Sequence, residues 1–368
     1  MPEIQQVAAA LEHQDYRTAA KLLKQLQQQS PNNPWVQFYI GRLFELTEKP
    51  DKAEKVYRKL LQSSMNPKVI AQARQGLQRI ETAEKNRRQA AINQATTNPE
   101  ATEPGVLILE PIPAEQKVDA AKQLARMLNT DPYTARMQLQ SRGWRLYRSG
   151  PIGELQVYGE EMRQAGIPVF WASLAEIRTM NVFRVQYFQS LTPQPVVVCK
   201  NTQDQLGALQ FDWSEVAHRV EGLLPLFMDA MDFDPRRKRN DQIRHKEMVQ
   251  DYAQIHDLHL PGRLSVLRFC DQSYDFNQGI SLDSEAAAVP RSQSTTRLKW
   301  NQLLAILNHS LNQSHLWTEF TPFAETAINY PLLLKNLPAF VDIERKSETP
   351  WDAAFQLYSG LVFKINRV

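Results

Sequence analysis

The sequence predicts a multidomain α+β protein with N-terminal α-helical repeats, a small α/β docking domain, and an antiparallel β sandwich or barrel with C-terminal helices. Three observations carry this prediction. Apolar residues recur at helical spacing through residues 1–94, and part of this pattern repeats after 34 residues. Short apolar runs alternate with amphipathic helices in residues 105–175. Residues 178–280 then hold β-branched and aromatic runs that are typical of strands.

The composition predicts folded domains and a mild overall charge. With 368 residues, 42% of them hydrophobic, the chain can form several cores. A net charge of +3 creates no general attraction to nucleic acid or to an anionic membrane. Cys199 and Cys270 lie in apolar runs, which predicts buried thiols and a reducing, cytoplasmic location. We expect neither a signal peptide nor a membrane-spanning helix, because no apolar run has the required length.

The 34-residue repeat near the start of the chain indicates paired helices. Ala19 recurs as Ala53 and Leu23 recurs as Tyr57, each 34 residues later. Gly41 precedes Ala53, and these two small residues allow two helices to approach closely. Apolar spacing and proline breaks predict helices over residues 15–29, 35–46, 52–63 and 67–93, the first of them capped by its opening aspartate.

This pattern resembles the tetratricopeptide repeat family over roughly residues 2–80, although Val7 replaces the glycine in the first repeat. The resemblance implies stacked helical pairs whose concave surface binds another protein. The alternative is that the aromatic residues on that surface pack internally, against the second domain of the same chain. The expected partner-binding residues are Trp35, Phe38, Arg42 and Glu45, with Ile4, Ala8 and Leu11 from the first repeat.

Residues 95–104 are small, polar and proline-bearing, which predicts a linker. The order strand, helix, helix, strand, helix, strand follows in residues 105–175. Residues 121–128, 131–139 and 160–166 in this order resemble the C-terminal domain of ribosomal protein L7/L12 and the related ClpS-type fold. The resemblance implies a second protein-docking module.

Residues 178–368 are predicted to form a β-rich domain with a C-terminal helical segment, residues 296–368. A polar, basic loop is expected over residues 235–250. Helices are expected over residues 298–311 and 351–362. The expected strands cover residues 182–188, 196–199, 206–211, 252–260 and 265–276.

The sequence lacks the common motifs of nucleotide binding, serine hydrolysis and zinc binding: GxxxxGK[ST], GxGxxG, GxSxG and CxxC are all missing. His256 and His259 are three residues apart in a predicted strand, so their side chains should point to opposite faces and not share a metal. We therefore expect no catalytic residues, no metal and no cofactor.

The expected basic loop holds six cations within eleven residues: Arg236, Arg237, Lys238, Arg239, Arg244 and Lys246. This cluster predicts contact with an anionic membrane or an acidic protein surface. Nucleic acid is disfavoured because no aromatic residues interleave with the charges. A solvated loop with no partner is the alternative.

Together these features predict a non-enzymatic adaptor or assembly factor, cytoplasmic, with protein partners that include large complexes and with no small-molecule substrate. Residues 211–216 and 351–363 resemble uncharacterised repeat proteins of oxygenic photosynthetic bacteria, which implies a role in photosynthetic assembly. Two alternatives remain open. The basic loop could dock the protein peripherally on anionic surfaces, or the β domain could hold an unrecognised enzyme site.

Overall fold

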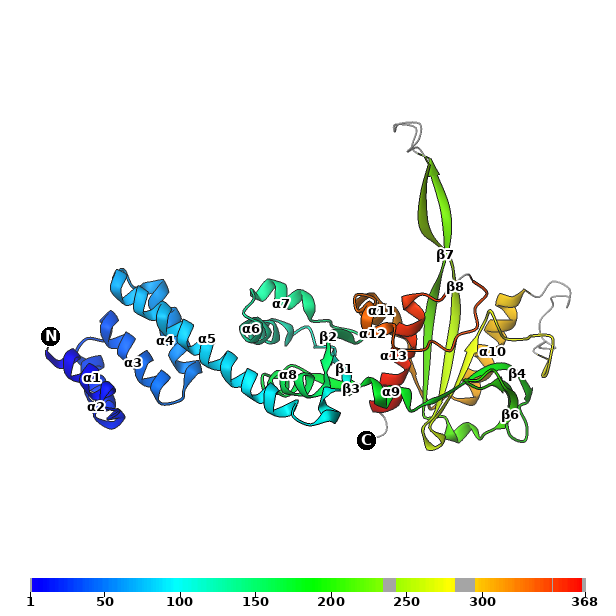
Figure 1. Cartoon of the computed structure of the whole chain (residues 1–368), viewed down its shortest axis with the longest axis horizontal. Coiled ribbons are helices and arrows are strands. Elements are labelled where there is room, and N and C mark those ends of the chain that lie inside the picture. Colours follow the sequence, from blue (N-terminus) through cyan, green and yellow to red (C-terminus); the bar gives the residue numbers. More distant parts are fainter. Residues whose placement is uncertain (1, 234–242, 282–294, 346, 366–368) are drawn as a thin grey trace. The chain divides into compact units, whose positions relative to one another are not determined.

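The computed structural model describes residues 2–233, 243–281, 295–345 and 347–365. The chain divides into two compact units, Met1–Gln94 and Ala95–Val368, and Figure 1 shows their elements. In the part of the chain that is described, no helix combines the length and apolarity needed to cross a membrane.

The first unit consists of paired helices with clear start signals. Asp15 caps the second helix by accepting a hydrogen bond from the Thr18 N–H, as predicted. Asn33 caps the third helix, and Pro34 occupies its first position. The helices are α1 (Pro2–Glu12), α2 (Tyr16–Gln29), α3 (Pro34–Leu46), α4 (Pro50–Ser63) and α5 (Pro67–Ala95).

Tyr57 of α4 shows why two glycines are needed in this unit. Its fully buried ring lies against Gly41 of α3 and Gly76 of α5. A Cβ atom at Gly41 would lie 2.6 Å from the ring, and one at Gly76 would lie 2.4 Å from it. The predicted close approach at Gly41 is therefore present, with a tyrosine as the neighbouring group.

The second unit begins with the small α/β region, whose element order is the one that the sequence predicted. Its three strands pair antiparallel in the order β2-β1-β3. The expected linker contains a short 3₁₀ helix, η1, which packs on α8. The elements are η1 (Pro99–Thr102), β1 (Pro104–Leu109), α6 (Lys117–Leu128), α7 (Pro132–Gln138), β2 (Arg145–Pro151), α8 (Ile152–Gln164), β3 (Val169–Ser173) and α9 (Leu174–Arg178).

A seven-stranded mixed sheet follows, with strand order β10-β7-β8-β9-β4-β5-β6. The pairs β10–β7 and β4–β9 are parallel and the others are antiparallel. Because β10 and β6 end the sheet, no barrel closes among the described residues, and the predicted sandwich or barrel is wrong. The elements are β4 (Asn181–Ser190), β5 (Val196–Lys200), β6 (Leu206–Gln210), η2 (Trp213–Glu215), β7 (His218–Phe233), β8 (Ile243–Leu260), η3 (Pro261–Arg263), β9 (Ser265–Cys270) and β10 (His315–Trp317).

Helices cover both faces of this sheet. Trp300 of α10 packs into a core on one face, while Phe355 and Tyr358 of α13 pack on the other. The core around α13 also contains Trp144 and Phe170 of the small α/β region, so residues 95–368 form one compact unit where the sequence suggested a linker and two domains. The helices are α10 (Thr296–Ser310), α11 (Phe320–Ala327), α12 (Pro331–Leu334) and α13 (Pro350–Ile365).

The long hairpin of β7 and β8 replaces part of the expected basic loop. Residues 243–250 belong to β8, and the backbone register pairs Arg244 with Asp232 and Lys246 with Ala230. The other four basic residues, at positions 236–239, lie outside the described residues. Figure 1 shows the hairpin extending past the helices that flank the sheet.

Candidate functional site

A groove of about 470 Å³ lies on the first unit. Its walls come mainly from α1, α3 and α5. The lining mixes apolar, aromatic and charged side chains, as protein-binding surfaces often do. The lining residues are Ala8, Leu11, Glu12, Gln14, Tyr16, Phe38, Tyr39, Arg42, Leu46, Gln72 and Arg79.

The predicted aromatic anchors make internal contacts. Phe38 lines the groove but is only 5% exposed, and its ring centroid lies 6.0 Å from that of Tyr57. Trp35 is half-buried, packs edge-on against Phe38 and does not line the groove. Phe38 therefore forms part of the floor of the groove. The contacts of Trp35 are internal packing contacts within the first unit.

The predicted Arg42 and Glu45 belong to one ion-pair cluster. The Glu45 carboxylate accepts hydrogen bonds from Arg42 Nη1 at 2.6 Å, Arg79 Nε at 2.7 Å and Tyr57 Oη at 2.8 Å. Burial alone would raise the pKa of Glu45, but hydrogen bonds from Arg79, Arg42 and Tyr57 outweigh it and hold that pKa below its usual value. Glu45 thus fixes two guanidinium groups at the groove wall and offsets part of their charge.

Sequence reasoning missed Tyr39, Gln72 and Arg79. Tyr39, Arg42 and Leu46 recur at helical spacing on α3, and this periodicity could have identified the lining face. Gln72 and Arg79 lie on α5, a predicted helix to which the sequence assigned no partner-binding residue. Their contribution depends on how α5 stacks beside α3, and the local sequence does not encode that placement.

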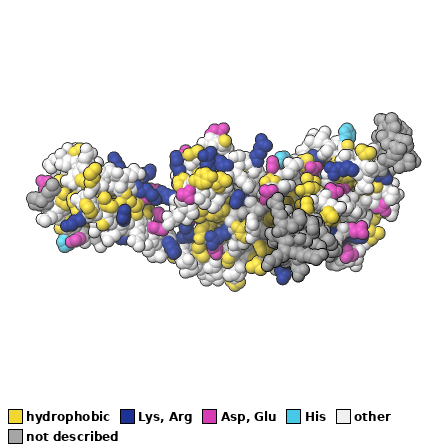
Figure 2. Space-filling view, turned by 90° about the horizontal axis from the view of Figure 1, so that it is seen from above, with side chains coloured by type: hydrophobic (Ala, Val, Ile, Leu, Met, Phe, Trp, Pro, Cys, Tyr) yellow, Lys and Arg dark blue, Asp and Glu magenta, His cyan; other side chains and the backbone are white. Residues whose placement is uncertain are grey.

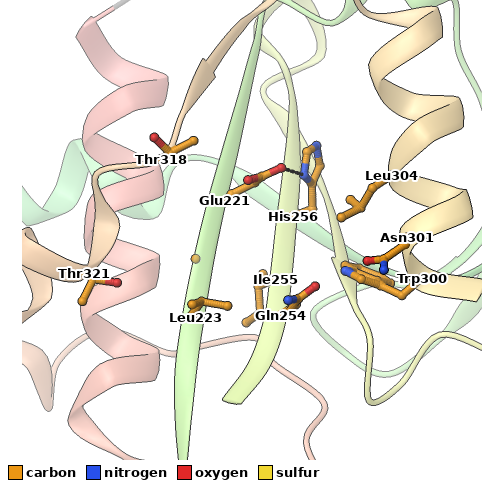
Figure 3. A pocket seen from close by; sticks show the side chains of 11 residues that line it. Glu221, Leu223, Gln254, Ile255, His256, Trp300, Asn301, Leu304, Thr318 and Thr321 are labelled. Atoms are coloured by element: carbon orange, nitrogen blue, oxygen red, sulfur yellow. Dashed lines mark ion pairs between the residues drawn. The ribbon is translucent and has the colours of Figure 1, made fainter. Parts of the chain in front are cut away.

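A second cavity, of about 310 Å³, lies in the second unit beside β7, β8 and α10 (Figure 3). Glu221 Oε1 lies 3.2 Å from His256 Nδ1, and this interaction with His256 lowers the pKa of Glu221 against the opposing effect of burial. The His256 side chain is 1% exposed, and its Nε2 is buried without a hydrogen-bond partner. The imidazole is therefore occluded, and the cavity presents the Glu221 carboxylate beside amide, hydroxyl and apolar groups.

His259 points to the opposite face of β8, as the strand periodicity predicts. Its Nε2 lies 2.9 Å from Ser359 Oγ, which donates a hydrogen bond to Asp257 Oδ2 at 2.6 Å. Asp257 also accepts two hydrogen bonds from Arg268. A serine, a histidine and an aspartate meet here, but their arrangement differs from a catalytic triad, in which the carboxylate contacts the histidine. Here the carboxylate contacts the serine, and all three side chains are buried. This network fastens α13 to the sheet.

The free ribbon of β7 and β8 exposes apolar side chains. The part of β8 before Ile255 forms ladder pairs with β7 alone, because pairing with β9 begins at Ile255 and continues to Leu260. Pro225 and a β-bulge after Leu226 interrupt the ribbon's edges, which disfavours addition of another strand. The exposed apolar residues are Leu223, Phe227, Met228, Met248, Val249 and Tyr252. Their side chains make the ribbon a candidate contact surface.

The remaining predictions concern charge, thiols and metals. On the face drawn in Figure 2, Lys and Arg side chains are scattered among hydrophobic and acidic ones. Both cysteines are buried, as predicted, and burial raises the pKa of Cys199 to about 11. Within the described ranges, no three His, Cys, Asp or Glu side chains converge to hold a metal ion.

Comparison with known proteins identifies part of the first unit. No curated protein and no solved structure matches the chain significantly. The resemblances to the L7/L12 and ClpS-type fold and to proteins of photosynthetic bacteria therefore stay predictions. Residues 10–74 match the family model described as tetratricopeptide repeat. This part of the first unit is therefore similar to tetratricopeptide repeats, and most of the residues that line the groove fall within the match.

Proposed function

We propose that this protein is a non-enzymatic adaptor that binds a partner protein in the groove of its first unit. Tetratricopeptide repeats generally mediate protein–protein interaction. The single observation that supports the proposal most is the groove of about 470 Å³ on α1, α3 and α5. An assembly role would require that a second surface of the chain contacts another component.

The lining indicates which kind of segment fits. Tyr39, Leu11 and Leu46 offer apolar contacts, and the Gln72 amide can both donate to and accept from a peptide backbone. Glu45 already engages the guanidinium groups of Arg42 and Arg79. The groove therefore favours a segment with an apolar anchor and few charges over a strongly acidic one.

The exposed ribbon of β7 and β8 is the candidate for the second contact. It carries six of the large apolar side chains that remain exposed in the described residues, including Phe227 and Tyr252. Exposed apolar side chains gathered on one projecting element are typical of protein interaction sites. Because Pro225 and the bulge disfavour strand addition, this contact would use side chains.

A paired-variant capture experiment tests the groove. The intact chain is compared with a Tyr39→Ala, Gln72→Ala variant and with a Lys24→Ala, Lys59→Ala control on the exposed sides of α2 and α4. Captured proteins are quantified by mass spectrometry, and the partner is then purified and titrated. Truncation of an aromatic hot spot costs about 2 kcal/mol, so with Tyr39 in that role affinity should fall by roughly 30-fold in the groove variant.

The control variant should bind like the parent. If the groove variant stays folded by circular dichroism and retains the same proteins at the same affinity, the groove is not the binding surface. The ribbon is tested in parallel with Phe227→Ser, Tyr252→Ser. A different protein should then be lost while the groove partner is kept.

A further inference from the structure

The second unit holds another polar cavity, of about 300 Å³, where α11 packs against the edge strand β2. The Leu146 N–H donates to Thr326 Oγ1 at 3.1 Å, and Tyr330 Oη donates to the Tyr147 carbonyl at 2.6 Å. These bonds satisfy backbone groups that an edge strand would otherwise expose. They also fix the position of β2 beside the cavity.

The lining of this cavity contains two arginines and no carboxylate. Its charged groups are therefore all positive, in a chain where acidic and basic side chains are otherwise nearly balanced. The lining residues are Gln138, Arg145, Leu146, Tyr147, Arg148, Thr326, Asn329 and Tyr330.

The two arginines differ in how their charge is offset. Arg148 Nη2 donates to Glu154 Oε1 at 2.6 Å, and its guanidinium stacks over the Tyr158 ring. The half-buried side chain of Arg145 has no hydrogen-bond or ion-pair partner within the described part of the chain. A partly buried cation without a counter-ion is unfavourable, and a bound anion would relieve that cost.

The Gln138 amide also fits an anion, while the Tyr330 hydroxyl already donates to the Tyr147 carbonyl. Gln138 Oε1 is buried with no partner, and rotation of the amide would present its NH₂ group there instead. Burial raises the pKa of Tyr330, while the charges of Arg145 and Arg148 act to lower it. The phenol therefore lies in the positive potential of both guanidinium groups.

We propose that this cavity binds an oxyanion, the phosphate or carboxylate group of a small molecule, with the Arg145 guanidinium as its main ligand and the Gln138 amide as a second donor. A guanidinium suits this role because its planar donors match two oxygens of either group. The cavity has room for the oxyanion and part of the molecule that carries it. This site is independent of the repeat groove.

The test uses the full-length chain. Thermal unfolding is followed with increasing inorganic phosphate or acetate, and chloride holds the ionic strength constant. A ligand that binds only the folded state raises the melting temperature as its concentration rises. Arg145→Gln should weaken the response to phosphate or acetate by about tenfold or more, because it removes charge-assisted hydrogen bonds. Gln138→Leu should weaken it less.

Arg142→Gln is the matched control, because Arg142 is exposed and three residues away on the same segment. It should respond like the parent. Without added anion, Arg145→Gln should melt at or above the parent temperature, since it removes an uncompensated charge. A stronger response to phosphate assigns the phosphate class, and one to acetate assigns the carboxylate class. The proposal is overturned if chloride acts equally or if Arg145→Gln keeps the full response.

Discussion

Asp257 of β8 and Arg268 of β9 form an ion pair that solvent does not reach, with 0% and 1% of their side chains exposed. Two hydrogen bonds, of 2.9 and 2.7 Å, join the carboxylate to the guanidinium. Arg268 also donates to Gln356 Oε1 of α13 and to the Ala339 carbonyl. One arginine thus connects the sheet, the last helix and the segment before it.

Removing the charge of Asp257 should strongly destabilise the second unit. Asp257→Asn leaves the buried Arg268 cation without its counter-ion, and such losses cost about 3–5 kcal/mol. Urea unfolding of the full chain, followed by tryptophan fluorescence, measures the change. Asp119→Asn is the control, because the Lys122–Asp119 pair is exposed and should contribute little. Equal stability of the two variants would contradict a structural role for the buried pair.

His259 should make stability depend on pH. Burial lowers its pKa in the folded protein from 6.5 to about 3. Between these values the unfolded chain binds a proton that the folded chain does not, so stability falls as pH falls below about 6.5. The slope from this residue is at most about 1.4 kcal/mol per pH unit. Urea unfolding between pH 5 and 8 should show a smaller slope for His259→Asn than for the parent.

Alanine at Gly41 or Gly76 should loosen the helical repeat. Each new Cβ would lie within 2.6 Å of the Tyr57 ring, and overpacking of this kind costs about 1–3 kcal/mol. Hydrogen exchange in α3–α5 of the intact chain should become faster. Gly207→Ala is the control, since its Cβ would meet nothing within 4 Å. Unchanged exchange in the Gly41→Ala and Gly76→Ala chains would mean that Tyr57 can move aside at no cost.

The basic cluster should contribute little to binding of the groove partner. Residues 229–247 contain five acidic side chains beside the six cations, and the register places Asp232 opposite Arg244. Reversing Arg236, Arg237, Lys238 and Arg239 to glutamate should leave capture of the groove partner unchanged. Sedimentation with anionic vesicles tests the membrane alternative. Salt-sensitive binding of the parent, lost in this variant, would support peripheral docking instead.

The local signals in the sequence predict much of the chain, because caps and breakers act over a few residues. Asp15 and Pro34 mark helix starts, and the structure has helices there. β7 was missed because Gly222, Pro225 and a run of acidic residues interrupt the strand pattern. Pro225 is tolerated because β10 ends opposite Val220, which leaves this part of β7 at the edge of the sheet.

The candidate sites were harder to predict than the helices. The parallel pairing of β4 with β9 joins strands that are about 80 residues apart, and no local pattern encodes such a pair. Arg145 and Thr326 meet at one cavity from elements far apart in the chain. Phe38 lines the groove, but its burial depends on Tyr57 from the next helix, which the pattern along one helix does not reveal.

The shared core around α13 has a consequence for synthesis on the ribosome. Phe170 emerges roughly 180 residues before α13 and Trp144 roughly 205 residues before it, and Tyr358 of α13 completes their shared core. At a translation rate of about 5–20 residues per second, about 10–40 seconds pass between the synthesis of these two residues and the synthesis of α13. The helical repeats can finish folding during that time. The nascent second unit therefore exposes this part of its core until α13 has been synthesised.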